Sequence, residues 1–141
     1  MQVFIVGTPF ETAMALDKKR LIRQIQEAKV ILDALNGAKA WSNHPCVLQY
    51  KGHEKWLEIY KGILMSCEKC EFGTAILSNI LVDKYRPDWH TQEYYDQMKR
   101  RLFEKDEEHY KQWAHLGKSL DNWYYIDGKF VKYRNGRKVE E

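Results

Sequence analysis

The chain has 141 residues, the size of one globular domain, and its 23 Lys and Arg against 20 Asp and Glu give a net charge of +3. With 44% hydrophobic residues, 13% aromatic residues and three prolines, the composition excludes a disordered chain. No apolar run approaches the roughly 20 residues of a membrane span, and residues 1–7 lack the basic start of a signal peptide. We therefore expect one cytoplasmic domain over residues 1–141 that makes no membrane contact.

The chain has three cysteines, an odd number, which argues against a disulfide framework. Such cysteine usage is typical of proteins in a reducing compartment. Cys67 and Cys70 form a single CxxC motif. A thioredoxin-like site needs a βαβ context, which is missing, and a zinc site needs two further ligands, for which only Cys46, His44 and His53 are candidates. We interpret the pair as two thiols near a core face, and we expect neither a metal nor a cofactor.

The N-terminal part predicts a short extended segment followed by a long helix. Residues 3–6 are apolar and precede the turn signal Gly7-Thr8-Pro9. Thr12 is a candidate cap for a first turn, but Asp17 is the stronger start signal, and Asn36-Gly37 is a stop signal for the helix that begins there. The apolar positions of this helix recur at spacings of three and four and predict a core-facing stripe: Leu21, Ile25, Ala28, Leu32 and Leu35.

Three further helical patterns follow along the chain. They run from Pro45 to Cys70 with an interruption at Gly52, from Thr74 to Tyr85, and from Thr91 to His115. Near the C-terminus, Asp127-Gly128 is a turn that would join two short strands. We predict an all-α fold, a compact single-domain helical bundle with at most a small terminal hairpin.

The long helix carries a cationic face beside its apolar stripe. At 100° per residue, Arg20, Arg23, Gln24 and Glu27 fall within about 100° of one another. A solvated salt-bridge face has the same spacing, and an exposed i,i+4 pair such as Arg23 and Glu27 contributes only a few tenths of a kcal/mol. The functional alternative is a phosphate-binding face on which the arginines position a DNA backbone and the carboxylate transfers protons.

The C-terminal segment is aromatic and basic and has two interpretations. Cations and rings alternate along it: Trp123, Tyr124, Tyr125, Lys129, Phe130, Lys132, Tyr133, Arg134, Arg137 and Lys138. Such a set suits stacking on bases and pairing with phosphates. In the second interpretation, the aromatic rings dock on the helices and the lysines point to water.

Four blocks of the chain, taken together, resemble the pyrimidine-dimer DNA glycosylase (endonuclease V-like) family. They are Asp17, Arg20-Leu21, Gln24, Glu27-Ala28 and Ile31-Leu32, then Trp41-Ser42-Asn43-His44-Pro45 with Gly52, then residues 105–110, and last Trp123-Tyr124 with Gly128-Lys129. The blocks occur in the family's order and span nearly the whole chain. The resemblance implies a compact all-α fold in which the N-terminal segment is threaded between helices and the C-terminal tail is aromatic and basic.

The resemblance also implies an activity, that of a DNA repair glycosylase with AP lyase activity on damaged double-stranded DNA containing pyrimidine dimers or abasic sites. In this family the α-amine at the mature N-terminus attacks C1′ of the sugar and forms an imine, and a glutamate on the first long helix, here Glu27, assists the β-elimination that cuts the strand. An α-amine suits this role, because a pKa of about 7.7–8.0 leaves roughly a tenth of it neutral at pH 7.

Residue roles follow from the matched positions. The resemblance implies Met1 and Glu27 as catalytic residues, and the DNA-binding residues that it implies are Arg20, Arg23, Gln24, Gln26, His44 and Lys129. Gln26 departs from the family pattern, because a phage member of the family has an arginine at the matching position. Trp41 is a candidate for stacking on a flipped base or for the core.

The second departure from the family concerns the mature N-terminus, whose α-amine is the nucleophile. Residue 2 is Gln2, a side chain normally too large to permit removal of Met1. The amine then belongs to Met1, or unusual processing exposes Gln2, or this branch has lost the lyase. We expect a monomer. The alternatives to an enzyme are a non-catalytic nucleic-acid-binding module of the same fold and a protein-interaction domain.

Overall fold

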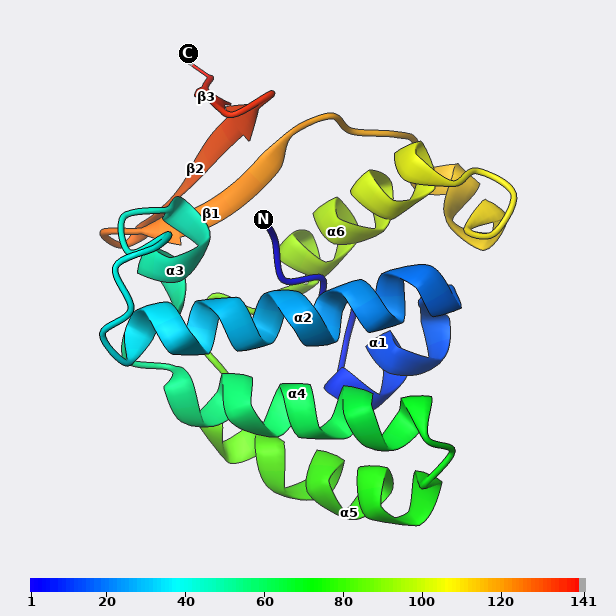
Figure 1. Cartoon of the computed structure of the whole chain (residues 1–141). Helices are drawn as coiled ribbons and strands as arrows, with labels where there is room; N and C mark the ends of the chain where they lie inside the picture. The colour runs from blue at the N-terminus through cyan, green and yellow to red at the C-terminus, as the bar shows by residue number, and fades with distance from the viewer. Residues whose placement is uncertain (140–141) are drawn as a thin grey trace. The chain divides into compact units, whose positions relative to one another are not determined.

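The computed structural model describes residues 1–139 and is dominated by helices, with one small sheet (Figure 1). Its elements are α1 (Pro9–Ala15), α2 (Lys18–Leu35), α3 (Pro45–Tyr50), α4 (Glu54–Glu68), α5 (Phe72–Val82), the 3-10 helix η1 (Asp83–Tyr85), α6 (Gln92–Lys105), the 3-10 helix η2 (Lys111–Leu116), β1 (Asn122–Ile126), β2 (Lys129–Arg134) and β3 (Arg137–Lys138). Throughout residues 1–139, none of the helices combines the length and the apolar character that crossing a membrane would require.

The chain divides into two compact units, a first unit of Met1–Asp88 and a second unit that begins at Trp89. The prediction of a mostly helical protein is confirmed, while the expectation of one domain stays a prediction. Each unit is described by itself.

The first unit opens with a helix, α1, that the sequence patterns did not predict. The Thr8 hydroxyl accepts a hydrogen bond from the backbone N–H of Glu11, and the Glu11 carboxylate accepts one from the backbone N–H of Thr8. This capping box is followed by Pro9 at the first helical position, where proline is favoured. Thr12 is therefore not the cap. It lies inside α1, and its hydroxyl donates to the Thr8 carbonyl and accepts from the N–H of Val6.

The long helix α2 begins and ends where the sequence predicted. Asp17 caps it by accepting from the backbone N–H of Arg20, and Asn36 ends it ahead of Gly37, whose φ is +108°. Leu21, Ala28 and Leu32 are buried as expected, whereas Ile25 and Leu35 are only half-buried. The core side also includes Gln24, Ile31 and Ala34.

Two further helices, α4 and α5, complete the packing of the first unit. α4 lies between α2 and α5 (Figure 1), and its fully buried aromatic side chains Trp56 and Tyr60 stack with ring centroids 5.0 Å apart. The predicted interruption at Gly52, with φ of +89°, separates α3 from α4. The third predicted helix also ends as expected at Tyr85, with its last turn in the 3-10 form.

The second unit contains α6, η2 and the sheet. The fourth predicted helix is too long, because α6 stops at Lys105. Asp106 leaves the helical conformation with φ −154° and ψ 87°, and only a separate 3-10 helix follows at Lys111–Leu116. The apolar spacing that suggested one continuous helix is therefore shared between two elements.

The C-terminal segment is a three-stranded antiparallel sheet with the strand order β1-β2-β3. The predicted hairpin is confirmed: Asp127 (φ +53°) and Gly128 (φ +80°) join strands in which Ile126 pairs with Lys129. Two successive positive φ values belong to the type I′ turn, whose twist matches that of paired strands. Asn135-Gly136 repeats the geometry at φ +52° and +75° and adds β3. This strand corrects the expectation of at most a hairpin, although the Asn-Gly signal was present in the sequence.

Candidate active site at the N-terminus

The start of the chain is buried although it belongs to no helix or strand. Residues 2–6 are all buried, so their backbone polar groups need partners, and side chains provide them. The Gln2 N–H donates to Glu27 Oε2 (2.9 Å), and the Gln2 carbonyl accepts from Gln24 Nε2 (2.9 Å). The Phe4 N–H donates to Gln24 Oε1 (2.8 Å), and the Phe4 carbonyl accepts from the Tyr60 hydroxyl (2.6 Å). Side chains of α2 and α4 thus hold the N-terminal segment in place.

Gln24 acts toward this segment as a neighbouring strand would. Its amide bonds the carbonyl of one residue and the N–H of the residue two further on, as one residue of a neighbouring parallel strand does with its own N–H and C=O. Gln24 is 3% exposed, and its amide oxygen also accepts from Tyr60 at 3.1 Å. Burial raises the pKa of Tyr60 well above its ordinary range, so the hydroxyl keeps the proton that it donates.

Glu27 connects this buried network to the surface. Its Oε2 receives the Gln2 N–H, and its Oε1 lies 3.1 Å from Arg23 Nε. The Glu27 side chain is 15% exposed and that of Arg23 is 71% exposed. The carboxylate is therefore mostly withdrawn from water, whereas the guanidinium that pairs with it reaches outward and remains accessible to an anionic partner.

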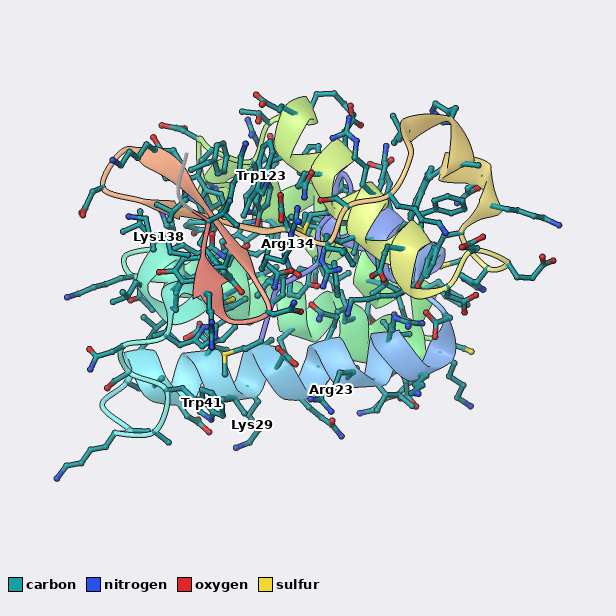
Figure 2. The ribbon with its side chains drawn as sticks, turned by 90° about the horizontal axis from the view of Figure 1, so that it is seen from above. Arg23, Lys29, Trp41, Trp123, Arg134 and Lys138 are labelled. Carbon is teal, nitrogen blue, oxygen red and sulfur yellow. The ribbon has the colours of Figure 1, made fainter. Side chains whose placement is uncertain are left out.

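A hollow of about 260 Å³ opens beside this carboxylate. It is lined by Met1, Arg23, Gln26, Glu27, Val30 and Trp41. Figure 2 shows Arg23, Lys29 and Trp41 along one edge of α2. The start of the chain, a carboxylate, a cation and an aromatic ring therefore share one small space.

The loop after α2 supplies the aromatic wall of the hollow. His44 ends this loop, and its Nδ1 accepts from the N–H of Cys46 (3.1 Å) and so caps α3. The His44 ring meets Trp41 edge-on with centroids 5.8 Å apart. Burial lowers the pKa of His44, the positive charge of the N-terminus lowers it further, and Glu27 opposes both. His44 therefore lies within electrostatic reach of both ends of the predicted catalytic pair.

Cys46, the next residue but one, belongs to the same buried region and is 0% exposed. Burial, the largest cause, raises the pKa of its thiol to about 12. The thiol is therefore neutral at physiological pH and is an unreactive part of the core.

Four of the eight predicted site residues line the hollow, namely Met1, Glu27, Arg23 and Gln26, and His44 adjoins its wall. Arg20 does not line it. Its guanidinium lies 3.2 Å from Asp17, with 23% of the side chain exposed. Gln24 is buried under the N-terminal segment and bonds its backbone, and the DNA contact predicted for it stays a prediction.

Lys129, the eighth residue, lies in the second unit, where it is exposed at the start of β2. Around it the rings of β1 and β2 stack on rings of α6 and of the segment before it: Trp89 stacks on Tyr125 with centroids 5.7 Å apart, and Tyr94 stacks on Phe130 at 5.4 Å. This packing is the docked arrangement of the two considered for the C-terminal segment. Among the basic residues of β2 and β3, Lys129, Arg137 and Lys138 are exposed, whereas the exposed Arg134 pairs with Asp121.

Sequence reasoning missed Tyr60 and Val30. Val30 lines the hollow, and Tyr60 bonds a backbone carbonyl 56 positions away along the chain. No local pattern announces such a contact, because it depends on how α4 packs against the N-terminal segment. For Trp41, the core interpretation is wrong, since its side chain is 56% exposed.

The site is thus one in which a sheltered carboxylate lies beside the N-terminus of the chain, next to an exposed arginine. Residues 1–66, which include every residue of the hollow, match the model of a protein family described as pyrimidine dimer DNA glycosylase. This match confirms the family resemblance over that part of the chain, and it supports DNA glycosylase activity at the level of the family. No curated protein and no solved structure gives a significant match.

Proposed function

We propose that this protein is a DNA repair glycosylase with AP lyase activity, acting on double-stranded DNA that contains pyrimidine dimers or abasic sites. The observation that carries the proposal is the 2.9 Å hydrogen bond from the Gln2 nitrogen to Glu27 Oε2, in a hollow that Met1 also lines. It puts an acid/base group beside the part of the chain that would supply the nucleophilic amine. The family match over residues 1–66 supports the same reaction class.

The proposed reaction uses the neutral form of the N-terminal α-amine. At a dimer, its lone pair attacks C1′ of the deoxyribose and the bond from C1′ to the base breaks. The displaced base takes up the proton that the attacking amine loses, and it stays joined to the neighbouring pyrimidine through the cyclobutane ring. Cleavage of the bond from C1′ to the ring oxygen then opens the sugar and yields an imine that is protonated at nitrogen. At an abasic site the amine adds to the C1′ aldehyde, and loss of water gives the same imine. Glu27 then removes a proton from C2′, and the electrons of that C–H bond expel the phosphate on the 3′ side. Hydrolysis of the imine releases the amine again.

The surroundings of Glu27 suit proton transfer. One oxygen is held by the backbone N–H of Gln2 and the other by Arg23, so the carboxylate is oriented before substrate arrives. Arg23, which is 71% exposed, would bind a phosphate flanking the lesion. Gln26 and His44 are proposed to contact the same stretch of DNA, and Arg20 and Lys129 are also proposed to contact DNA phosphates.

Two nitrogens are candidates for the nucleophile. In the chain as described, the nitrogen hydrogen-bonded to Glu27 is the amide of Gln2, which becomes an α-amine only after removal of Met1. Met1, one residue earlier, lines the hollow together with Glu27, so its α-amine is the second candidate. Either position keeps the amine close to the carboxylate, so both versions of the mechanism use Glu27.

Borohydride trapping on a duplex with one abasic site tests the proposal. Reduction of the imine is expected to give a covalent protein–DNA adduct. Peptide mapping of the adduct by mass spectrometry then identifies Met1 or Gln2 as the modified residue, and intact mass gives the N-terminus of the unmodified protein.

Acetylation of the N-terminal amine is the matched control, because an amide nitrogen does not form an imine. The acetylated protein is expected to form no adduct and to keep its salt-dependent affinity for DNA. Absence of any adduct with the unmodified protein, together with tight DNA binding, would instead support the non-catalytic nucleic-acid-binding module. An adduct that maps to a lysine would overturn the role of the N-terminus.

A further inference from the structure

The helix α5 of the first unit turns its large apolar side chains outward. Leu77, Ile80 and Leu81 are 67%, 69% and 60% exposed, and they are the three most exposed large hydrophobic residues among residues 1–139. Ile76 and Phe72 are also exposed. At 100° per residue these five side chains lie within about 180° of one another. Single exposed apolar residues are ordinary, but these five form one apolar surface, which we call the α5 face.

The opposite side of α5 explains why the α5 face stays outside. That side has small or polar residues: Ala75 is fully buried, and Ser78 and Asn79 are half-buried. Asn79 Oδ1 accepts from the backbone N–H of Phe10 in α1 (3.0 Å), and α5 packs on both α4 and α1. These contacts fix the rotation of the helix about its axis. The first unit itself therefore does not cover the α5 face.

The size of the α5 face matches half of a small protein interface. Its five side chains expose roughly 500 Å², whereas a monomer rarely exposes a contiguous apolar patch larger than a few hundred Å². Two copies of the face would bury roughly 1,000 Å², which is about the lower limit for a specific interface. The residues at the two ends of the helix would add to that area.

The charges around the α5 face are complementary to those of a second copy. No charged residue lies within Phe72–Val82, so two such faces meet without burying a charge. The exposed charges at the two ends of α5 differ in sign, net −1 before the helix and net +1 after it: Glu68, Lys69 and Glu71, then Asp83, Lys84 and Arg86. These signs also suit the helix dipole. In an antiparallel pair of α5 helices, each acidic end lies beside a basic end.

We propose that this protein forms a homodimer in which the α5 faces of two copies pack on each other, antiparallel, about a two-fold axis. Such a contact uses the same surface twice, as an uncharged face with opposite charges at its ends allows. A membrane surface fits less well, because helices that lie on membranes have a basic polar side, and α5 has none. The proposal replaces the expectation of a monomer. It is independent of the proposed function, since no residue that lines the hollow beside Glu27 belongs to α5.

Sedimentation equilibrium tests the dimer with the full chain. An interface of this size is expected to give a Kd in the micromolar range, so the average mass should rise from one chain to two between about 1 and 200 μM protein. Leu77→Glu puts a charge in the middle of the face, twice per dimer, and should raise the Kd at least about 100-fold. Leu48→Glu changes an exposed leucine of α3 (41% exposed) and is the matched control, with an unchanged Kd expected. Circular dichroism checks that both variants fold.

Disulfide cross-linking tests the orientation of the two helices. Leu77 is the middle residue of α5, so near the two-fold axis it meets its counterpart in the second copy. Cys70 is exposed and precedes one end of the helix, whereas Cys46 and Cys67 are buried. Oxidation with copper phenanthroline is expected to link Leu77→Cys into a dimer that reductant separates. The unmodified protein is expected to stay unlinked, because an antiparallel arrangement keeps the two Cys70 thiols apart.

The possible outcomes separate this proposal from the enzymatic one. A mass of one chain at every concentration would overturn the dimer, as would a dimer that persists in Leu77→Glu. Linking through Cys70 would contradict the antiparallel arrangement, and a monomer that binds neutral phospholipid vesicles through Leu77 would assign the α5 face to a membrane. Leu77→Glu should keep abasic-site cleavage within about twofold, as expected for a surface substitution away from the hollow. A dimer without a borohydride adduct on abasic DNA would reject the proposed function and leave this inference standing.

Discussion

Each unit of the molecule contains a carboxylate that is mostly buried and lies against the Nε of an arginine. In the first unit the pair is Glu27 with Arg23 at 3.1 Å, and in the second it is Asp121 with Arg134 at 2.7 Å. The carboxylate side chains are 15% and 19% exposed and their arginines 71% and 52% exposed. By geometry and burial the two pairs are nearly equivalent.

The difference lies in what else the carboxylates meet. The second oxygen of Glu27 accepts the N–H of Gln2 in a hollow lined by Met1. The hollow around Asp121 is lined instead by side chains of three further ion-paired residues, Glu104, Glu107 and Lys118. An ion pair on its own therefore predicts little about function. A nucleophile candidate beside one carboxylate, and compensating charges around the other, distinguish the two sites.

Removal of the Glu27 charge tests most directly whether this carboxylate, unlike Asp121, takes part in catalysis. Glu27→Gln preserves shape and removes the base that would take the C2′ proton, so strand cleavage at an abasic site is expected to fall about 10²- to 10⁴-fold, the usual contribution of general acid–base catalysis. Single-turnover cleavage of a labelled duplex measures it.

Asp121→Asn is the matched control, with similar burial and the same kind of partner. It is expected to leave cleavage within about twofold and to lower stability only slightly, because the partner Arg134 is 52% exposed and solvent screens the pair. Equal rate losses for the two variants would show that the carboxylates act through folding, and the catalytic role of Glu27 would then be rejected.

A second matched pair consists of two buried glutamines, Gln24 and Gln97, each 3% exposed. Gln24→Leu strands the Gln2 carbonyl and the Phe4 N–H, and leaving buried polar groups unpaired costs about 1–3 kcal/mol each. We therefore expect urea denaturation to show a loss of roughly 2–6 kcal/mol, together with a loss of lyase activity, because the N-terminal segment is released.

Gln97→Leu removes two comparable bonds in the second unit, from Gln97 Nε2 to Ser119 Oγ and to the Asp121 carbonyl, both at 2.8 Å. A similar loss of stability is expected, but abasic-site cleavage by the folded fraction should be unchanged. If Gln24→Leu kept full activity while folded, the anchoring of the N-terminal segment would have no part in catalysis.

The helix boundaries show how much of the fold could be predicted from the sequence. The boundaries at Asp17, Asn36 and Gly52 were predictable because caps and positive-φ glycines are local signals. So was the Asp127-Gly128 turn. The end of α6 was not, because the apolar spacing continues past Lys105 although the helix does not.

For the site, sequence identified the right helix but not the use of each residue. Gln24 and Arg23 are adjacent and both polar, yet one is buried against the N-terminal segment and the other is exposed. Helical periodicity places Gln24 at the edge of the apolar stripe and Arg23 on the side away from it, but it does not show that a backbone segment covers Gln24. Tyr60 and the exposure of Trp41 likewise depend on packing between elements distant in sequence.

The salt dependence of DNA binding tests whether residues of both units contact DNA phosphates. Each phosphate neutralised by a cation contributes about 0.9 to the slope of log K against log salt. Arg23→Gln in the first unit and Lys129→Ala in the second are each expected to lower the slope by about 1 and to weaken binding to all sequences alike. Fluorescence anisotropy titrations over a range of salt concentrations measure this.

Lys69→Ala is the control for lost charge, since Lys69 is exposed at the end of α4 and lines neither hollow. A slope changed by Arg23→Gln but not by Lys129→Ala would confine the DNA-binding surface to residues of the first unit. The reverse result would contradict the role proposed for Arg23.

The smallest expected effect concerns His44, which caps α3 through an unprotonated Nδ1. Burial and the N-terminal charge lower its pKa below the ordinary 6.5, against the opposing effect of Glu27. The unfolded chain therefore binds a proton at His44 more readily than the folded one. Stability should be fully present above pH 6.5 and should decrease as pH falls through that value.

His44→Asn keeps a good cap acceptor that does not titrate, so urea midpoints at pH 7.5 and 5.5 should lie closer together in this variant than in the unmodified protein. An unchanged difference would place the acid sensitivity elsewhere, and a larger one would mean that the charged imidazole stabilises the fold through Glu27.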